Sequence, residues 1–142
     1  MTVDPSRLLA TRFKGGSMAP TLRDGDVILW RGNDGHPVVH VGDVVGFFEH
    51  ERLVAHRLIE LHPQRDLATT RGDAHLSSDP PLAMGDIAYV AVAALRGQRP
   101  VPLGPISDPL RLSLALAHEA RRVGGALRQR VRRIATLRPP KH

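Results

Sequence analysis

The stretch Val27-Ile28-Leu29-Trp30 opens a series of short apolar runs that extends to residue 94. The runs occupy residues 27–30, 38–41, 44–48, 53–55 and 87–92. Each has the length of a strand, is partly β-branched or aromatic, and is separated from the next by Gly, Asp, Asn or Pro. The pattern predicts a compact, mostly antiparallel β domain.

The C-terminal part differs from this domain in charge and in periodicity. Residues 1–106 carry 11 Lys and Arg against 12 Asp and Glu, whereas residues 107–142 carry 9 against 2. Four prolines from residue 100 to residue 109 indicate a linker, and Asp108-Pro109 is a suitable helix start. Apolar residues then recur at helical spacing, at Leu116, Ala120, Val123, Leu127, Val131 and Ile134. We therefore predict a β domain at 1–106 and a basic amphipathic helical tail at 107–142.

Composition limits the classes of protein to which the chain can belong. It contains no cysteine, which excludes disulfides and thiolate metal sites, and we expect neither a metal nor a cofactor. Residues 1–14 lack the apolar stretch of a signal peptide, and apolar runs such as 88–95 are far shorter than the roughly 20 residues of a spanning helix. We expect a protein that is soluble or peripheral to a membrane.

The basic tail indicates an anionic partner, either lipid headgroups or nucleic acid, although a solvated helix face has the same composition. Residues 107–142 contain no Phe, Trp or Tyr on which nucleic-acid bases could stack. An anionic membrane surface, or a membrane partner, is therefore favoured over nucleic acid as the partner of the tail.

Three segments contain residues suited to nucleophilic catalysis: 15–26 with Ser17, 54–58 with His56, and 69–79 with two aspartates. A hydroxyl needs an adjacent base at neutral pH, and histidine, with an ordinary pKa of about 6.5, suits that role. Of the eight histidines, only His40 and His56 lie in strand-like runs. Taken singly, a serine after two glycines is more typical of a turn, and a strand histidine of ordinary packing.

The order of these segments resembles the signal peptidase I family. The matching residues are Ser17-Met18-Ala19-Pro20-Thr21-Leu22 with Gly25-Asp26, then Gly42-Asp43, His56-Arg57, Gly72-Asp73 with Asp79, and Gly85-Asp86. The likeness covers residues 13 to 103 and is strongest in the serine segment. It is similar in particular to the archaeal and endoplasmic-reticulum branch, in which histidine replaces the lysine base of the usual bacterial enzymes.

The resemblance implies a serine endopeptidase that cuts a signal, leader or precursor peptide after small residues. It implies the β fold shared by signal peptidases and self-cleaving repressors. Ser17 would be the nucleophile, His56 the general base, Asp79 the carboxylate that orients the imidazole, and Asp73 a supporting acid. Because both aspartates follow the same turn, the residues alone do not decide which of them reaches His56.

The same resemblance extends to the surroundings of the nucleophile. It implies that the backbone at Gly16 and Ser17 supports the oxyanion, and that Met18 and Pro20 lie beside the substrate. Gly15 stands where part of the family has a serine that donates to the oxyanion, so the second donor is unassigned. A lysine base is improbable because Lys14 and Lys141 are the only lysines and neither has the family's position.

Two other functions remain open from the sequence. A self-cleaving repressor-type peptidase would share the β fold, but such proteins usually have a lysine base and an N-terminal DNA-binding domain. A non-catalytic module with a vestigial site would bind nucleic acid or a membrane surface through the basic tail. Its binding to phosphate backbones would weaken steeply with salt.

Overall fold

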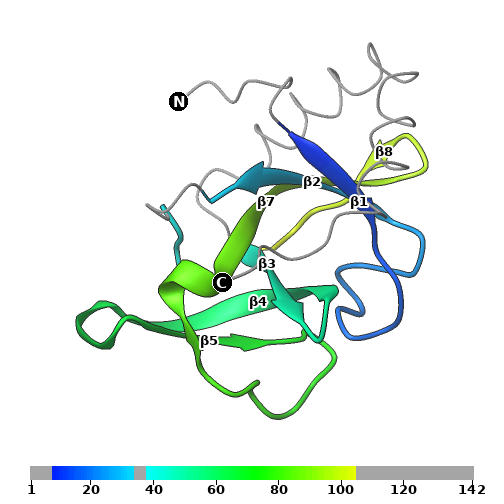
Figure 1. Ribbon diagram of the computed structural model, residues 1–142. Coiled ribbons are helices and arrows are strands. Elements are labelled where there is room, and N and C mark those ends of the chain that lie inside the picture. Colours follow the sequence, from blue (N-terminus) through cyan, green and yellow to red (C-terminus); the bar gives the residue numbers. More distant parts are fainter. Residues whose placement is uncertain (1–7, 34–37, 105–142) are drawn as a thin grey trace.

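The computed structural model describes residues 8–33 and 38–104, which form one antiparallel sheet (Figure 1). Its strands are β1 (Leu9–Arg12), β2 (Val27–Gly32), β3 (Val44–Glu49), β4 (Arg52–His62), β5 (Leu67–Arg71), β6 (Leu82–Ala83), β7 (Ile87–Arg96) and β8 (Arg99–Pro100). Within those ranges the only helical turns are the 3-10 turns η2 (Pro63–Arg65) and η3 (Met84–Asp86). The mostly β, antiparallel fold class predicted from the sequence is confirmed.

The basic helical tail predicted at 107–142 lies outside the described residues. The linker predicted from Pro100 to Pro109 is wrong in its described part, because Pro100 belongs to β8 and Val101 and Leu103 are buried. No helix in the part of the chain that the structure describes is long and apolar enough to cross a bilayer.

Strands β3 and β7 lie in the middle of the sheet, whose order is β1-β2-β7-β3-β4-β5-β6, with β8 paired to β7. The longest strand is β4, with 11 residues. It pairs with β3 through residues 52–57 and with β5 through residues 57–62. His56 and Arg57 therefore lie where the pairing of β4 passes from one neighbour to the other.

The strand predicted at 38–41 is wrong. Val39 is buried there, but Val38 and Val41 are 55% and 56% exposed. The His40 N–H donates to the Asp43 carboxylate at 2.8 Å, and the Asp43 N–H donates to the His40 carbonyl at 3.0 Å. These bonds close a turn, so the backbone groups that make them do not join a strand ladder.

The central part of the core is built around Trp30, which is 1% exposed and donates from Nε1 to the Thr11 hydroxyl at 2.7 Å. Gly46 of β3 packs against the indole, since a Cβ atom there would lie 3.2 Å from Trp30. Ala91 and Ala94 of β7 belong to the same cluster. Small residues on β3 and β7 thus accommodate the one large ring.

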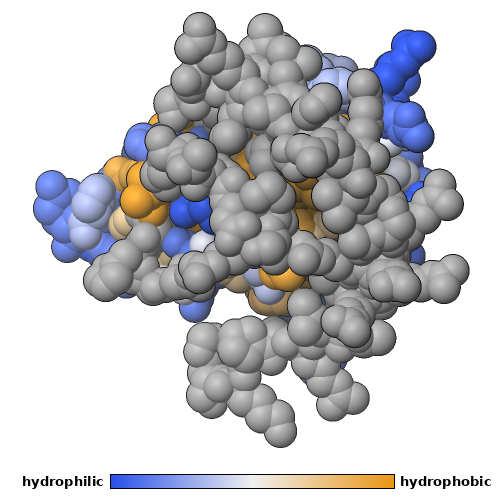
Figure 2. All heavy atoms as spheres, turned by 90° about the horizontal axis from the view of Figure 1, so that it is seen from above, coloured by the Kyte–Doolittle hydropathy of each residue, from blue (hydrophilic) through white to orange (hydrophobic). Residues whose placement is uncertain are grey.

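From above, hydrophilic side chains gather at two opposite edges of the molecule, with apolar side chains visible between them (Figure 2).

Residues 13–26 form the loop between β1 and β2, called here the serine loop. Its two ends are joined by a 2.7 Å hydrogen bond from the Phe13 N–H to the Asp26 carbonyl. Met18 and Leu22 are both fully buried, and the Leu22 N–H donates to the Met18 carbonyl at 2.9 Å. These two side chains hold the serine loop against the core.

Asp26 joins the start of β2 to the end of β7. Its buried carboxylate accepts two hydrogen bonds from the Arg96 guanidinium, at 3.0 and 2.9 Å, and one from the Arg23 N–H at 2.8 Å. Burial by itself would raise the pKa of Asp26, but the hydrogen bonds from Arg96 and Arg23 outweigh it and hold this pKa below its ordinary value.

We expect Asp26→Asn to lower stability more at neutral pH than at about pH 3. Because the native pKa of Asp26 is depressed, the ionised group contributes stability above its unfolded pKa, about 3.9, and this is lost as the pH falls through the native value. Urea unfolding at the two pH values measures the difference. The exposed Asp66→Asn variant is the control, and an equal loss at both pH values for Asp26→Asn would contradict the expectation.

Candidate active site

Ser17 lies in the serine loop, half-buried, directly before the fully buried Met18. Its carbonyl oxygen accepts a hydrogen bond of 3.0 Å from the Ala74 N–H. The next residue makes a second link, because the Met18 sulfur accepts from the Asp73 N–H at 3.4 Å. Backbone atoms of residues 72–79, called here the aspartate loop, therefore hold the segment that carries Ser17.

His56 is the predicted base, and its side chain is 9% exposed. Its Nδ1 atom lies 2.5 Å from Oδ2 of Asp79, which also accepts a 2.7 Å bond from the Thr70 hydroxyl. The imidazole meets Phe47 edge to face, with ring centres 6.1 Å apart, and meets His75 in the same way at 5.4 Å. The Asp79 carboxylate and the buried Phe47 ring thus restrict the orientation of the His56 ring, while the exposed His75 packs on it from the surface.

Gly72 shows how close the segment that carries Ser17 is to His56. A Cβ atom on Gly72 would lie 2.5 Å from the Ser17 carbonyl oxygen and 3.1 Å from Nε2 of His56. The serine loop and the free nitrogen of His56 therefore border the same small space. No hydrogen bond joins the Ser17 hydroxyl to His56 among the contacts of the described residues, and such bonds are often looser before substrate binds.

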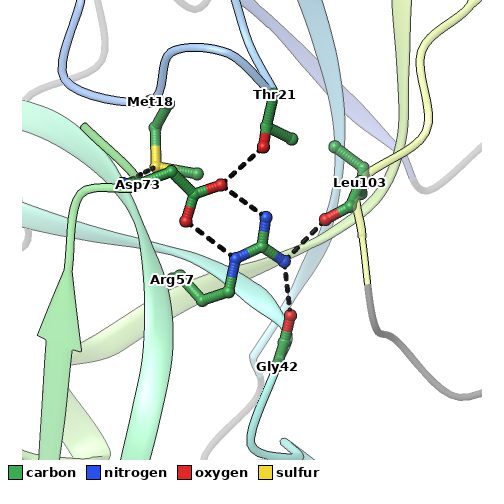
Figure 3. A network of polar contacts seen from close by, with 6 residues as sticks. All are labelled: Met18, Thr21, Gly42, Arg57, Asp73 and Leu103. Atoms are coloured by element: carbon green, nitrogen blue, oxygen red, sulfur yellow. Dashed lines mark hydrogen bonds and ion pairs between the residues drawn. The ribbon is translucent and has the colours of Figure 1, made fainter.

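Asp79 contacts His56, whereas Asp73 pairs with Arg57 and Thr21, as Figure 3 shows. Arg57 pairs with it through both ends of the guanidinium, Nε to Oδ1 at 2.9 Å and Nη2 to Oδ2 at 2.7 Å. The Thr21 hydroxyl donates to Oδ2 at 2.6 Å. The remaining Arg57 nitrogen donates to the carbonyls of Gly42 and Leu103, at 2.8 and 2.6 Å. This group, the Arg57 network, connects the serine loop, the aspartate loop, the turn before β3 and the segment after β8.

The charge of Asp73 is stabilised by that network. Burial by itself would raise the pKa of Asp73, but the hydrogen bonds from Arg57 and Thr21, with the charge of Arg57 and Arg71, lower it below the ordinary value. Asp73 therefore stays ionised and engaged at neutral pH. Its two oxygens are directed at Arg57 and Thr21, not at His56.

The residues predicted from the sequence thus divide into three groups. The Ser17 backbone carbonyl and Nε2 of His56 both lie next to Gly72, and Asp79 is the aspartate that contacts His56. Asp73 lies beside them but pairs with Arg57. Met18, predicted to lie beside the substrate, is 0% exposed and packs in the core, whereas Gly16 and Pro20 are exposed.

Several residues of the site were not singled out by sequence reasoning. Thr70 supports Asp79, Gly72 permits the close approach of the two loops, and His75 lies on the His56 ring. Gly72 and Arg57 belong to the Gly-Asp and His-Arg pairs of the motif, which was a usable signal. Nothing in the sequence pattern distinguished His75 from the other histidines in turns.

The site contains no cluster typical of a metal cofactor, since no group of three or more His, Asp or Glu side chains in residues 8–33 and 38–104 is arranged to hold an ion.

Comparison with known proteins, by family models, curated sequences and solved structures, gives no match.

We expect Gly72→Ala to destabilise the protein by about 1–3 kcal/mol, the usual range for overpacking a well-packed position. The added methyl would lie 2.5 Å from the Ser17 carbonyl, a backbone atom that cannot move without shifting the serine loop. Urea unfolding measures the loss. Gly85→Ala is the matched control because a Cβ atom there has nothing within 4 Å. Equal stability of the two variants would contradict the close approach.

Arg57→Lys should cost roughly 2–3 kcal/mol of stability, because an ammonium cannot reproduce the two-pronged contact with Asp73 or reach both carbonyls. Arg57 and Asp73 are only 11% and 18% exposed, so water does not replace the lost bonds fully. Thermal and urea unfolding measure the loss. Arg71→Lys, on the exposed end of β5, is the control and should change stability little.

Proposed function

We propose that the chain is a serine endopeptidase in which Ser17 attacks the peptide and His56 is the general base. The observation that supports the proposal is the set of contacts that His56 makes. This histidine is largely buried, pairs through Nδ1 with a carboxylate, and borders the serine loop through Nε2. A histidine held in this way by Asp79 is the arrangement that activates a serine hydroxyl.

The chemistry follows from the hydrogen bond to Asp79. When His56 is neutral, the carboxylate keeps the proton on Nδ1, so the lone pair of Nε2 is free to accept a proton. Nε2 takes the proton of the Ser17 hydroxyl as the oxygen attacks the peptide carbonyl, and the imidazolium then gives it to the departing amine. Water, activated by the same nitrogen, hydrolyses the acyl-enzyme and restores Ser17.

Asp79 would stabilise the imidazolium formed in this cycle, and Thr70 keeps the Asp79 carboxylate in place through its 2.7 Å bond. The backbone N–H of Ser17, supported by the exposed Gly16, would donate to the oxyanion. Asp73 has no part in proton transfer in this proposal. It acts through Arg57 and Thr21 to hold the serine loop next to β4.

The substrate class rests on the resemblance to signal peptidase I. We propose a signal, leader or precursor peptide that binds extended along a strand edge and is cut after small residues, as in Ala-x-Ala. We also propose that the sheet has the β fold of signal peptidases and self-cleaving repressors. The basic tail at 107–142 would hold the enzyme at an anionic membrane surface.

The test is cleavage of peptides with Ala-x-Ala sites at about pH 8, followed by mass spectrometry. We expect Ser17→Ala and His56→Ala each to lose activity by roughly 10⁴-fold or more, and Asp79→Asn to lose about 10⁴-fold because the tautomer is no longer fixed. Ser78→Ala and His62→Ala replace the same residue types away from the reacting atoms and should retain activity.

The variants separate the possible results. Loss in the three site variants with retention in the two controls would support the Ser/His mechanism and report the cleavage preference. Cleavage that survives in Ser17→Ala would rule out Ser17 as the nucleophile. Fragments of the chain itself at raised pH, without cleavage of added peptides, would favour the self-cleaving alternative.

A further inference from the structure

A second histidine, His75, lies on the exposed side of the proposed base. The two rings are nearly perpendicular, at 87°, with centres 5.4 Å apart. A Cβ atom placed on Gly72 would lie 3.1 Å from Nε2 of His56 and 3.0 Å from Nδ1 of His75. One nitrogen of each imidazole therefore borders the same point, next to the serine loop.

These two nitrogens are available as ligands. Nδ1 of His56 is held by Asp79, which leaves Nε2 with the lone pair when the ring is neutral. The His75 ring has no hydrogen-bonding partner among the described residues. His75 is exposed, so its side chain can rotate to bring Nδ1 toward Nε2 of His56.

The support of His56 also matches what transition metals require. A metal-bound histidine nearly always directs its other nitrogen to a carboxylate or carbonyl, which fixes the tautomer and makes the ligand more basic. Asp79 takes this position at His56, and Thr70 orients Asp79 in turn. The carboxylate that leaves Nε2 of His56 able to accept a proton therefore also leaves it able to bind a metal ion such as Zn²⁺.

We propose that His56 and His75 form a binding site for a divalent transition-metal ion of the zinc class, and that the bound ion inhibits the peptidase by occupying Nε2 of the base. The inhibition rests on the proposed function, whereas the binding does not. Zn²⁺ accepts imidazole nitrogen at about 2.0–2.1 Å in tetrahedral geometry, with open positions filled by water. Two protein ligands make a reversible site, consistent with the lack of a three-residue cluster in the described chain.

His62 and His40, the other described histidines that lie near a carboxylate, lack this arrangement. His62 lies 2.8 Å from Glu60, but both side chains are about half exposed, 45% and 57%. His40 lies 3.8 Å from Asp43 and is 59% exposed. Neither has a second imidazole in ring contact. His62 is therefore the matched control for His75, since it is an exposed histidine with a possible oxygen ligand beside it.

Binding is tested in the full-length Ser17→Ala protein, so that the result does not depend on peptidase activity. This protein is titrated with Zn²⁺ alone in a calorimeter, and its histidine NMR signals are followed in parallel. The same titration is made with three double variants, which add His75→Asn, Asp79→Asn or His62→Asn to Ser17→Ala. We expect one site that shifts the His56 and His75 signals. His75→Asn should weaken it by at least about 10-fold and Asp79→Asn by about 10- to 100-fold, while His62→Asn changes little.

Inhibition is tested in the otherwise native chain, with each variant's cleavage rate compared with its own rate in a chelator. Zn²⁺ should inhibit the native and His62→Asn proteins, with reversal by chelator, and His75→Asn should need at least about 10-fold more Zn²⁺. Equal affinity of His75→Asn and its parent would overturn the site. Binding at this site without inhibition of an active enzyme would overturn the inhibitory role. If no peptide is cut at all, the proposed function fails while the titration still decides the metal site.

Discussion

The pairing of Arg57 with Asp73 is the interaction on which the arrangement of the site depends. One planar guanidinium makes two bonds to Asp73 and two more to backbone carbonyls that are far apart in sequence. Because Asp73 also holds Thr21, the serine loop is fixed to the strand that carries His56. Lysine could not do this, since its ammonium is a point charge without the fork geometry.

Two aspartates six positions apart have separate tasks because they meet different neighbours. Asp79 meets His56 and Thr70, so its charge is directed at the proposed base. Asp73 meets a permanent cation, which holds its pKa low and uses both of its oxygens. A single loop thus supplies one carboxylate that contacts the proposed base and one that holds the surrounding segments together.

The sequence predicted the β class because strand runs such as β2 and β7 have the right length and composition. The motif also predicts Ser17 and His56 as site residues, and their roles stay predictions. The strand prediction failed at 38–41, where Asp43 closes a turn that apolar periodicity does not register. The choice between the two aspartates depends on which way each side chain points, and the contact of His75 with His56 depends on the loop path. Neither is encoded in spacing along the chain.

Besides the Asp73 side chain, the aspartate loop also contacts the Ser17 segment through its main chain. The Ala74 N–H binds the Ser17 carbonyl and the Asp73 N–H contacts the Met18 sulfur, while residues 76–78 are exposed to solvent. Main-chain contacts are indifferent to side-chain identity. The side chains at 76–78 can therefore change without displacing the Ser17 segment that the loop holds.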